Sequence, residues 1–275
     1  MALRKKKKNK KGTGAGWAGG ALITIAVLAM GALGAFYYFA PRGLALDPKS
    51  LCPVDGPDGI RVVLVDATDD LPEVAKRQAL QILDDEITSL PAYYKLDIRV
   101  LDVAGIKSRS LFAKCNPGDG KGLSEWTDNP RIARQKWIEG FRKPAREAVE
   151  SSLGSASADN SPIMAAIQDI AVDQFSSVAA QRAEKKLVVI SDMLEFTPYY
   201  SQYPRAGDLS YERFRRSPAY IKFRTDLHGA EMRVEYVQRA SISAQFATAL
   251  AKFWQQWTHD NGGSKFSAHR LQGVN

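Results

Sequence analysis

An uncharged stretch near the amino terminus constrains this chain more than any other feature. Residues 16–40 contain no charged side chain. A helix over this stretch rises about 36 Å, which is enough to cross the hydrocarbon layer of a bilayer, about 30 Å thick. Trp17 lies at one end, and Tyr37 and Tyr38 lie at the other, as aromatic residues do at membrane interfaces. The sequence therefore predicts one transmembrane helix over residues 16–40.

This helix is either an uncleaved signal anchor or a cleaved signal peptide. A cleaved peptide has an apolar core of about 7–15 residues and small residues at its cleavage site. Here the core is longer, and bulky residues 36–39 occupy that place, which favours the anchor. Seven basic residues lie in the tail 1–15, so the positive-inside rule keeps the amino terminus in the cytoplasm and places the rest of the chain outside.

The basic tail also explains the net charge of +8. Without its seven basic residues, the chain has nearly as many Lys and Arg residues as its 30 acidic ones. No basic field remains that would attract a nucleic acid, so we expect no nucleic-acid partner. Small residues at Gly16, Gly20, Gly31 and Gly34 permit close helix packing, which is compatible with a homo-oligomer.

The simplest setting for such a chain is a bacterial inner membrane, with the carboxyl-terminal domain in the periplasm. The two cysteines, Cys52 and Cys115, both lie in the exported part. An oxidising compartment allows a disulfide between them, and two free thiols are the alternative.

The exported part has a linker, a domain and a tail. Residues 41–59 are rich in Pro and Gly and predict an extended linker. Residues 60–260 predict a folded domain, and residues 261–275 a flexible tail. We expect strands at 60–65, 96–103, 187–190 and 232–237, helices at 69–90, 131–152, 161–171 and 243–258, and a loop at 104–129. Because strands and helices alternate, the domain is predicted to be α/β, with a doubly wound, mostly parallel sheet.

Three loops at the expected carboxyl ends of the strands carry oxygen-bearing side chains. The loop after the first strand contains Asp66, Thr68 and Asp70. Ser161 precedes the middle helix, and Asp192 follows the buried strand at 187–190. Ligands bind at this edge of such sheets, and carboxylates with hydroxyls are ligands for Mg²⁺. Asp70 also suits the first turn of the following helix, where acids are favourable.

At these residues the chain resembles the von Willebrand factor A-like (vWA-like) family. The resemblance places Asp66, Thr68 and Asp70 in the first loop of a metal-ion-dependent adhesion site, Ser161 at the position of a threonine, and Asp192 at a later aspartate. It implies protein binding in which Mg²⁺ meets an acidic group of a partner. Asp70 replaces a hydroxyl of the family pattern, and Met193 stands where glycine is usual. A degenerate, metal-free site is therefore the alternative.

An enzyme is the third interpretation. A phosphatase of the haloacid dehalogenase type also begins with an aspartate after a buried strand, but its second aspartate, two residues on, is replaced here by Thr68. Other hydrolase motifs, such as Gly-x-Ser-x-Gly or His-Glu-x-x-His, do not occur. We therefore expect no catalytic residues and no enzymatic activity, with a metal-dependent hydrolase as the weakest alternative.

The segment 197–230 is the other candidate for function. It is rich in tyrosine and arginine, residue types that are enriched at binding hot spots. The residues proposed for a partner contact are Tyr199, Tyr200, Tyr203, Arg205, Arg213, Arg215 and Arg216. The alternative is that the tyrosine rings cover the sheet and the arginines face water. The sequence thus predicts a membrane-anchored domain that binds protein within a membrane-associated assembly, or a metal-free structural subunit of one.

Overall fold

The computed structural model describes two compact units, Met1–Leu44 and Ala45–Asn275. In the first unit, helix α1 covers Gly14–Phe39. Its stretch Gly20–Tyr38 has a mean hydropathy of 2.0 and is long and apolar enough to span a membrane, a property that signal peptides share. The described residues are 14–39, 44–66, 68, 72–102, 107–123, 129–151, 160–203, 209–239 and 242–271.

The second unit is built on a six-stranded sheet with the strand order β3-β2-β1-β4-β7-β8. All neighbouring strands are parallel except β2 and β3, which are antiparallel. The strands are β1 (Gly59–Val65), β2 (Lys95–Asp102), β3 (Lys107–Cys115), β4 (Glu184–Ser191), β7 (Glu231–Tyr236) and β8 (Lys265–Arg270). The predicted α/β fold with a doubly wound, mostly parallel sheet is confirmed.

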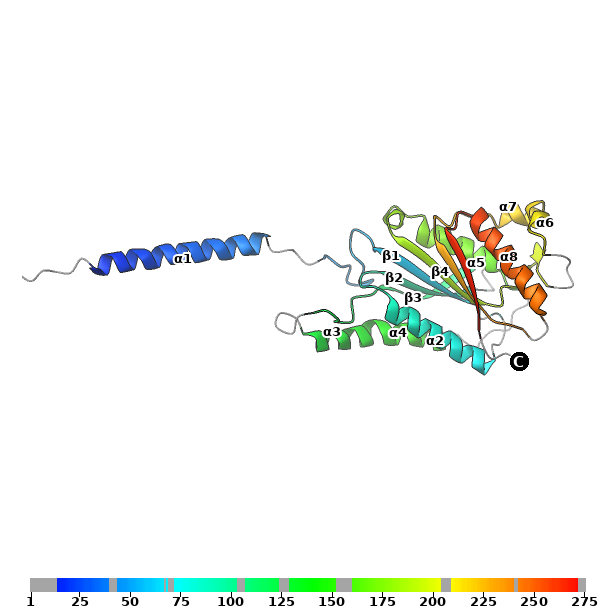
Figure 1. Ribbon diagram of the computed structural model, residues 1–275, viewed down its shortest axis with the longest axis horizontal. Coiled ribbons are helices and arrows are strands. Elements are labelled where there is room, and N and C mark those ends of the chain that lie inside the picture. The colour runs from blue at the N-terminus through cyan, green and yellow to red at the C-terminus, as the bar shows by residue number, and fades with distance from the viewer. Residues whose placement is uncertain are drawn as a thin grey trace, which may run out of the picture. The chain divides into compact units, whose positions relative to one another are not determined.

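Helices cover both faces of the sheet (Figure 1). On one face lie α2 (Glu73–Ser89), α3 (Pro130–Trp137) and α4 (Lys143–Glu150), and on the other lie α5 (Ile163–Ile170) and α8 (Ala244–Asp260). Strand β1 carries the continuous apolar run 62–65 because it has a neighbouring strand on each side: Val62 and Leu64 pack towards α5 and α8, and Val63 and Val65 pack towards α2. Each fully buried side chain of this kind contributes about 1.5–3 kcal/mol.

Two segments expected to lack regular structure contain the edge strands. The region 104–129 contains β3, and the expected tail 261–275 contains β8, which pairs in parallel with β7. Both strands are largely exposed, with polar residues such as Lys265, Ser267 and His269. The buried apolar run that marks a central strand is therefore missing from both sequences.

The predicted helix 131–152 is divided by a wide helical turn, η1 (Ile138–Arg142), between α3 and α4. Pro144 lies in the first turn of α4. Because proline lacks an N–H group, the preceding turn rearranges where we expected a kink. The remaining elements are η2 (Ala171–Phe175), η3 (Ala179–Gln181), β5 (Phe196–Thr197), β6 (Tyr200–Ser201), α6 (Tyr211–Arg215) and α7 (Pro218–Lys222).

A disulfide joins Cys52 to Cys115, 63 residues apart in the sequence. It connects the segment before β1 to the end of β3, and the Cys115 N–H donates to the Ser50 carbonyl at 2.8 Å beside it. The chain-entropy model assigns about 4 kcal/mol to a loop of this size. The described part of the expected linker 41–59 is thus attached to the domain from Ala45 onward.

Candidate functional site

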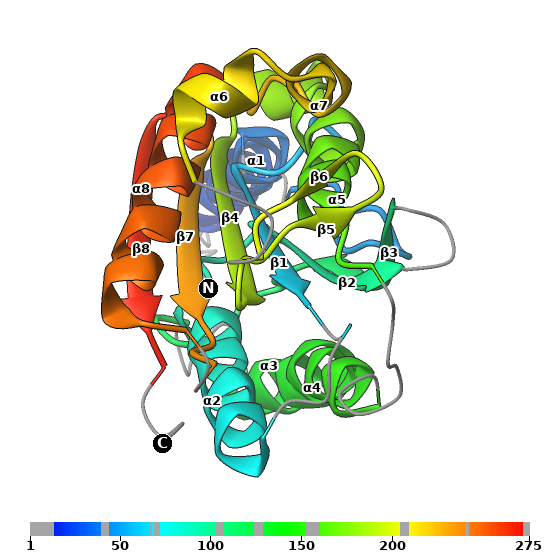
Figure 2. The same cartoon turned by 90° about the vertical axis from the view of Figure 1, so that its right-hand side faces the viewer.

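The candidate site lies where β1 and β4 end side by side. The Asp66 N–H donates to the Ile190 carbonyl at 2.9 Å, so the backbone holds the end of β1 against β4. In Figure 2 the arrowheads of β1, β4 and β7 reach one edge of the sheet. We call the side chains of Asp66, Thr68, Ser161, Ser191 and Asp192 at this edge the rim.

Asp66 is the centre of the rim, and its carboxylate accepts four hydrogen bonds. Oδ1 accepts from the Thr68 hydroxyl at 2.6 Å and from the Thr68 N–H at 3.1 Å. Oδ2 accepts from the Ser191 hydroxyl at 2.7 Å and from the Ser161 hydroxyl at 3.3 Å. A carboxylate has about four acceptor positions, so Asp66 is fully hydrogen-bonded while it is 7% exposed.

Ser161 reaches Asp66 because its backbone is paired with the segment after β4. Ser161 and Phe196 exchange two backbone hydrogen bonds, at 2.8 and 3.0 Å. Although Ser161 precedes α5 and has a side chain that suits a helix cap, it does not cap this helix. The helix begins at Ile163 with no side-chain cap, and the Ser161 hydroxyl donates to Asp66 instead.

Asp192 is the second carboxylate of the rim, and an arginine neutralises it. Its Oδ2 pairs with Nε of Arg239, and its Oδ1 accepts from the Leu194 N–H at 2.9 Å. Burial, the largest cause, and the charge of Asp66 raise the pKa of Asp192 to about 6, although Arg239 and the Leu194 N–H oppose the rise. The rim thus carries two buried carboxylates with one cation beside the second.

A third carboxylate, Glu195, is completely buried behind the rim. Its Oε2 accepts from the Met164 N–H at 2.8 Å, in the first turn of α5. Burial, the largest cause, and the charge of Asp66 raise the pKa of Glu195 to about 8, although hydrogen bonds from the backbone of Met164 and Ile163 oppose the rise. Glu195 therefore ties α5 to the segment after β4 and holds a proton at neutral pH.

Met193 connects the rim to the core in an unusual backbone conformation. Its φ is +58°, a value that glycine adopts far more easily than other residues. The Trp254 indole N–H donates to the Met193 carbonyl at 2.9 Å, and the Ser191 hydroxyl accepts from the Met193 N–H at 2.8 Å. These two bonds hold the turn that orients Asp192 next to Ser191.

The structure brings together four of the five residues predicted for the metal site: Asp66, Thr68, Ser161 and Asp192. The fifth, Asp70, lies outside the described residues. Sequence reasoning missed Ser191, Arg239 and Glu195 as members of the site. Ser191 could have been found from the sequence, because it directly precedes Asp192. Arg239 could not, because it follows β7 and reaches the rim only through the placement of β7 beside β4.

The oxygen set of the rim matches the ligand chemistry of Mg²⁺. Asp66, Thr68 and Ser161 would hold the ion once the two hydroxyls turned from Asp66 to the ion, and Asp192 would take part in exchange for its contact with Arg239. Arg239 already supplies a positive charge next to Asp192, so an ion and the guanidinium compete for that carboxylate. Among the described residues, no group of three or more His, Cys, Asp or Glu side chains is gathered for a metal.

The tyrosine- and arginine-rich segment divides into packed rings and exposed cations. Tyr211 of α6 and Tyr220 of α7 both donate to Asp260 Oδ2 at 2.8 Å, and Tyr200 of β6 stacks on Phe253, so these rings attach α6, α7 and β6 to α8. In contrast, Arg213, Arg215 and Arg216 are exposed. Tyr199 is 58% exposed with the Lys222 Nζ 4.1 Å from its ring centre, and Arg205 lies outside the described residues.

Tyr203 joins this segment to the rim. Its ring lies 5.9 Å from the Arg239 guanidinium carbon and packs edge-on against Phe196. Tyr203 therefore lies beside the site, as expected for the segment. The exposed Arg215 and Arg216 pair instead with Glu212.

The strand order, the antiparallel edge strand and the rim give the domain a vWA-like fold. No protein-family model and no curated protein matches the chain. Among solved structures, it is similar to a von Willebrand factor type A protein from Catenulispora acidiphila, with 14% identity and a TM-score of 0.42. That match covers 79% of this chain and 39% of the other, so this chain spans well under half of its length.

The chain is also similar to an aerotolerance-related membrane protein from Bacteroides fragilis. The identity is 12%, the TM-score is 0.35, and the match covers 77% of this chain and 91% of the other. Both similarities are distant, and neither carries information on what this chain binds.

Proposed function

We propose that this chain is a membrane-anchored protein whose extracytoplasmic vWA-like domain binds a partner protein through the rim, within a membrane-associated assembly. The observation that carries the proposal is the convergence of side chains from separate loops on Asp66, next to the arginine-paired Asp192. Buried carboxylates with a raised pKa are typical of functional sites.

The proposal places the domain outside the cytoplasm. Helix α1 and the seven basic residues before it support a signal anchor with its amino terminus inside. The disulfide Cys52–Cys115 supports an oxidising compartment, and the bacterial periplasm is the simplest one. Protease added to spheroplasts is expected to digest the domain; a domain that is protected until the membrane is lysed contradicts this placement.

We propose binding and no catalysis at the rim. Each of the three rim hydroxyls donates to Asp66, an arrangement that orders the loops. Among the described residues, the hydrogen bonds of these hydroxyls include none to a histidine that would activate them. Turnover of a phosphate or ester substrate that Asp66→Ala abolishes would contradict this part of the proposal.

A metal-free rim is the second candidate, and Arg239 favours it. The guanidinium occupies Oδ2 of Asp192, so the charge balance that a cation would provide is partly present in the chain itself. In this version the rim is a structural contact in the assembly and needs no Mg²⁺.

The test is capture of partners by the tagged full chain in detergent, with and without a chelator of divalent cations. Loss of capture on Asp66→Ala and on Asp192→Ala, with an unchanged circular dichroism spectrum, supports the rim as the contact. Glu147→Ala on the exposed face of α4 is the matched control and is expected to capture normally. Capture that neither rim variant reduces contradicts the proposal, and sensitivity to the chelator separates the metal-assisted rim from the metal-free one.

A further inference from the structure

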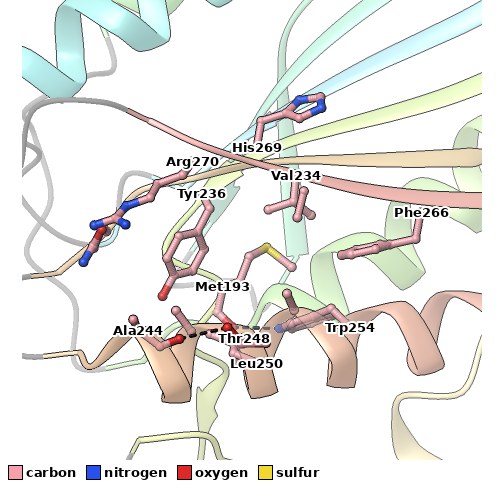
Figure 3. Close-up of a pocket in the computed structure, with 14 residues that line it drawn as sticks. Met193, Val234, Tyr236, Ala244, Thr248, Leu250, Trp254, Phe266, His269 and Arg270 are labelled. Atoms are coloured by element: carbon pink, nitrogen blue, oxygen red, sulfur yellow. Dashed lines mark hydrogen bonds between the residues drawn. The ribbon is translucent and has the colours of Figure 1, made fainter.

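A hollow of about 330 Å³ lies between α8 and the strands β7 and β8 (Figure 3). It exists because α8 carries small residues where it covers the edge of the sheet: Ala244, Ala247 and Ala251 share one helix face and line the hollow. Further along the same helix, the large side chains Phe253 and Trp257 are buried in the core. The size is within the range of pockets that bind ligands.

The walls of this α8–β8 pocket are mainly apolar. Val234 of β7, Phe266 of β8, and Leu250 and Trp254 of α8 face the hollow (Figure 3). Met193 also lines it, directly after Asp192 in the sequence. The α8–β8 pocket therefore adjoins the rim, and one partner is able to contact both.

Two polar atoms in the pocket lack a hydrogen bond within the described part of the chain. They are the Tyr236 hydroxyl and the Gln238 Oε1, and both are buried. Burial, the largest cause, and the charge of Asp192 raise the pKa of Tyr236 to about 12, so its hydroxyl remains a donor at neutral pH. A buried polar atom without a partner costs about 1–3 kcal/mol. A ligand that satisfies both atoms must offer one acceptor and one donor, which a peptide group does.

Strand β8 is an edge strand, and its outer edge pairs with no other strand in the described ranges. Its two charged side chains, Lys265 and Arg270, are both basic, and the strand also carries His269. Lys265 and His269 contact Glu231 and Glu235 of β7, whereas Arg270, at the pocket, has no acidic partner among the described residues. An extended segment with an acidic residue therefore complements this edge.

We infer that the α8–β8 pocket anchors an extended acidic segment of the partner protein. An apolar side chain such as leucine enters the hollow, its peptide group pairs with Tyr236 and Gln238, and a neighbouring carboxylate meets Arg270. This inference rests on the proposed function and assigns the partner's chemistry.

The test uses the full chain in nanodiscs with fluorine-labelled tryptophan. The chain has five tryptophans, and Trp254 lines the pocket; Trp254→Phe identifies its NMR resonance. The probe is N-acetyl-Asp-Leu-Asp-N-methylamide, with Gly in place of Leu or Lys in place of Asp as comparison probes. We expect a saturable shift of the Trp254 resonance with the leucine probe, none with the glycine probe, and about fivefold weaker binding of the lysine probe.

Variants then locate the probe. Ala251→Phe fills the hollow and is expected to weaken binding at least about tenfold, whereas Gln255→Phe on the exposed side of α8 leaves it unchanged. Tyr236→Phe keeps the ring and removes only the donor, so it serves if Ala251→Phe fails to fold; it is expected to weaken binding about fivefold. A Trp254 resonance that does not move, or equal binding of the leucine and glycine probes, overturns the inference.

The outcome of the probe experiment is independent of the capture experiment with the rim variants. Rim-dependent partner capture without probe binding overturns only the pocket inference. Probe binding without rim-dependent capture overturns the proposed function at the rim and leaves the pocket as a peptide site.

Discussion

The rim and a second polar cluster, centred on Arg99, use the same residue types in different ways. In the Arg99 cluster, the guanidinium joins Asp97 of β2 at 2.7 Å and also pairs with Asp173, after α5. Ser108 of β3 completes the cluster by donating to Asp169 at 2.6 Å. The cluster thus connects β2, β3 and the α5 region around one central cation.

The two regions differ in how their carboxylates titrate. Burial raises the pKa of Asp173, but hydrogen bonds from Arg99 and Gln174 and the charge of Arg99 outweigh it, so the net pKa is lowered. At the rim, burial and Asp66 raise the pKa of Asp192 to about 6 despite Arg239. An arginine partner therefore does not decide alone whether the pKa of a carboxylate is raised or lowered. In the Arg99 cluster, the arginine stabilises the ionised carboxylates around it, whereas the rim retains acidic groups that a partner or cation would stabilise.

The largest expected effect comes from breaking the Arg99 cluster. Arg99→Met leaves Asp97, which is completely buried, without its cation, and we expect the free energy of unfolding to fall by about 3–5 kcal/mol. Urea denaturation measures it. Arg239→Met is the comparison and is expected to cost about 1 kcal/mol, because Arg239 is partly exposed. Equal losses of unfolding free energy would show that the rim contributes as much to the stability of the fold as the Arg99 cluster does.

Glu195 makes the stability of the rim region depend on pH. Its pKa is about 8 in the folded state, against 4.5 for an unperturbed glutamate. Between these values the folded state holds a proton that the unfolded state has released, so stability falls as the pH rises from about 4.5 to about 8 and then levels off. A difference of one in pKa corresponds to about 1.4 kcal/mol, so the total fall is a few kcal/mol.

Glu195→Gln is expected to remove the part of this fall above about pH 6, below which Asp192 also contributes, and thermal denaturation from pH 5 to 9 measures it. Gln174→Met, beside Asp173, leaves it unchanged, because a lowered pKa acts below the ordinary value of 3.8, where stability is lost as the pH falls. A wild-type profile that is flat between pH 5 and 8 contradicts the assignment.

Competition between Arg239 and Mg²⁺ has a smaller expected effect. Wild-type Tm is expected to be unchanged by added Mg²⁺, whereas Arg239→Met frees Asp192 for the ion. At a concentration about ten times the dissociation constant, Mg²⁺ then stabilises the fold by about 1.4 kcal/mol, which raises Tm by a few degrees. Adding Asp66→Asn to Arg239→Met is expected to abolish the response. An equal Mg²⁺ response in the wild type would show that the guanidinium does not compete.

The smallest expected effect on stability is at the exposed arginines. Arg215→Ala with Arg216→Ala changes the free energy of unfolding by less than about 0.5 kcal/mol, because both side chains are exposed. If this surface contacts the partner, capture by the full chain falls. Arg146→Ala on α4, also exposed and paired with a glutamate, is the matched control. Unchanged capture by the double variant rejects the contact.

The sequence could predict the centre of this fold but not its edges. The runs around Val63 and Val188 are apolar because both faces of the central strands are buried, and that requirement is visible in the sequence. Strands β3 and β8 bury little and therefore carry no such signal. Their positions follow from pairing with β2 and β7, which only the folded chain shows.

The same distinction applies to the site. Asp66 and Asp192 were predictable because each directly follows a buried strand. Arg239 was not, because its role depends on the side-by-side placement of β4 and β7. The choice of Ser161 between capping α5 and binding Asp66 was likewise decided by its pairing with Phe196, a contact between residues 35 positions apart.

The disulfide has a mechanical consequence for an anchored protein. If a partner pulls on the domain while the amino-terminal helix is held in a membrane, tension that arrives at Cys52 passes through the sulfur bridge to Cys115. Residues 53–114, which include β1, α2 and β2, then carry no load along the chain. Reduction of the bridge would put these residues under tension, and their unfolding would then let the chain extend by about 200 Å. In a protein held in a membrane, the oxidised bridge would prevent that extension.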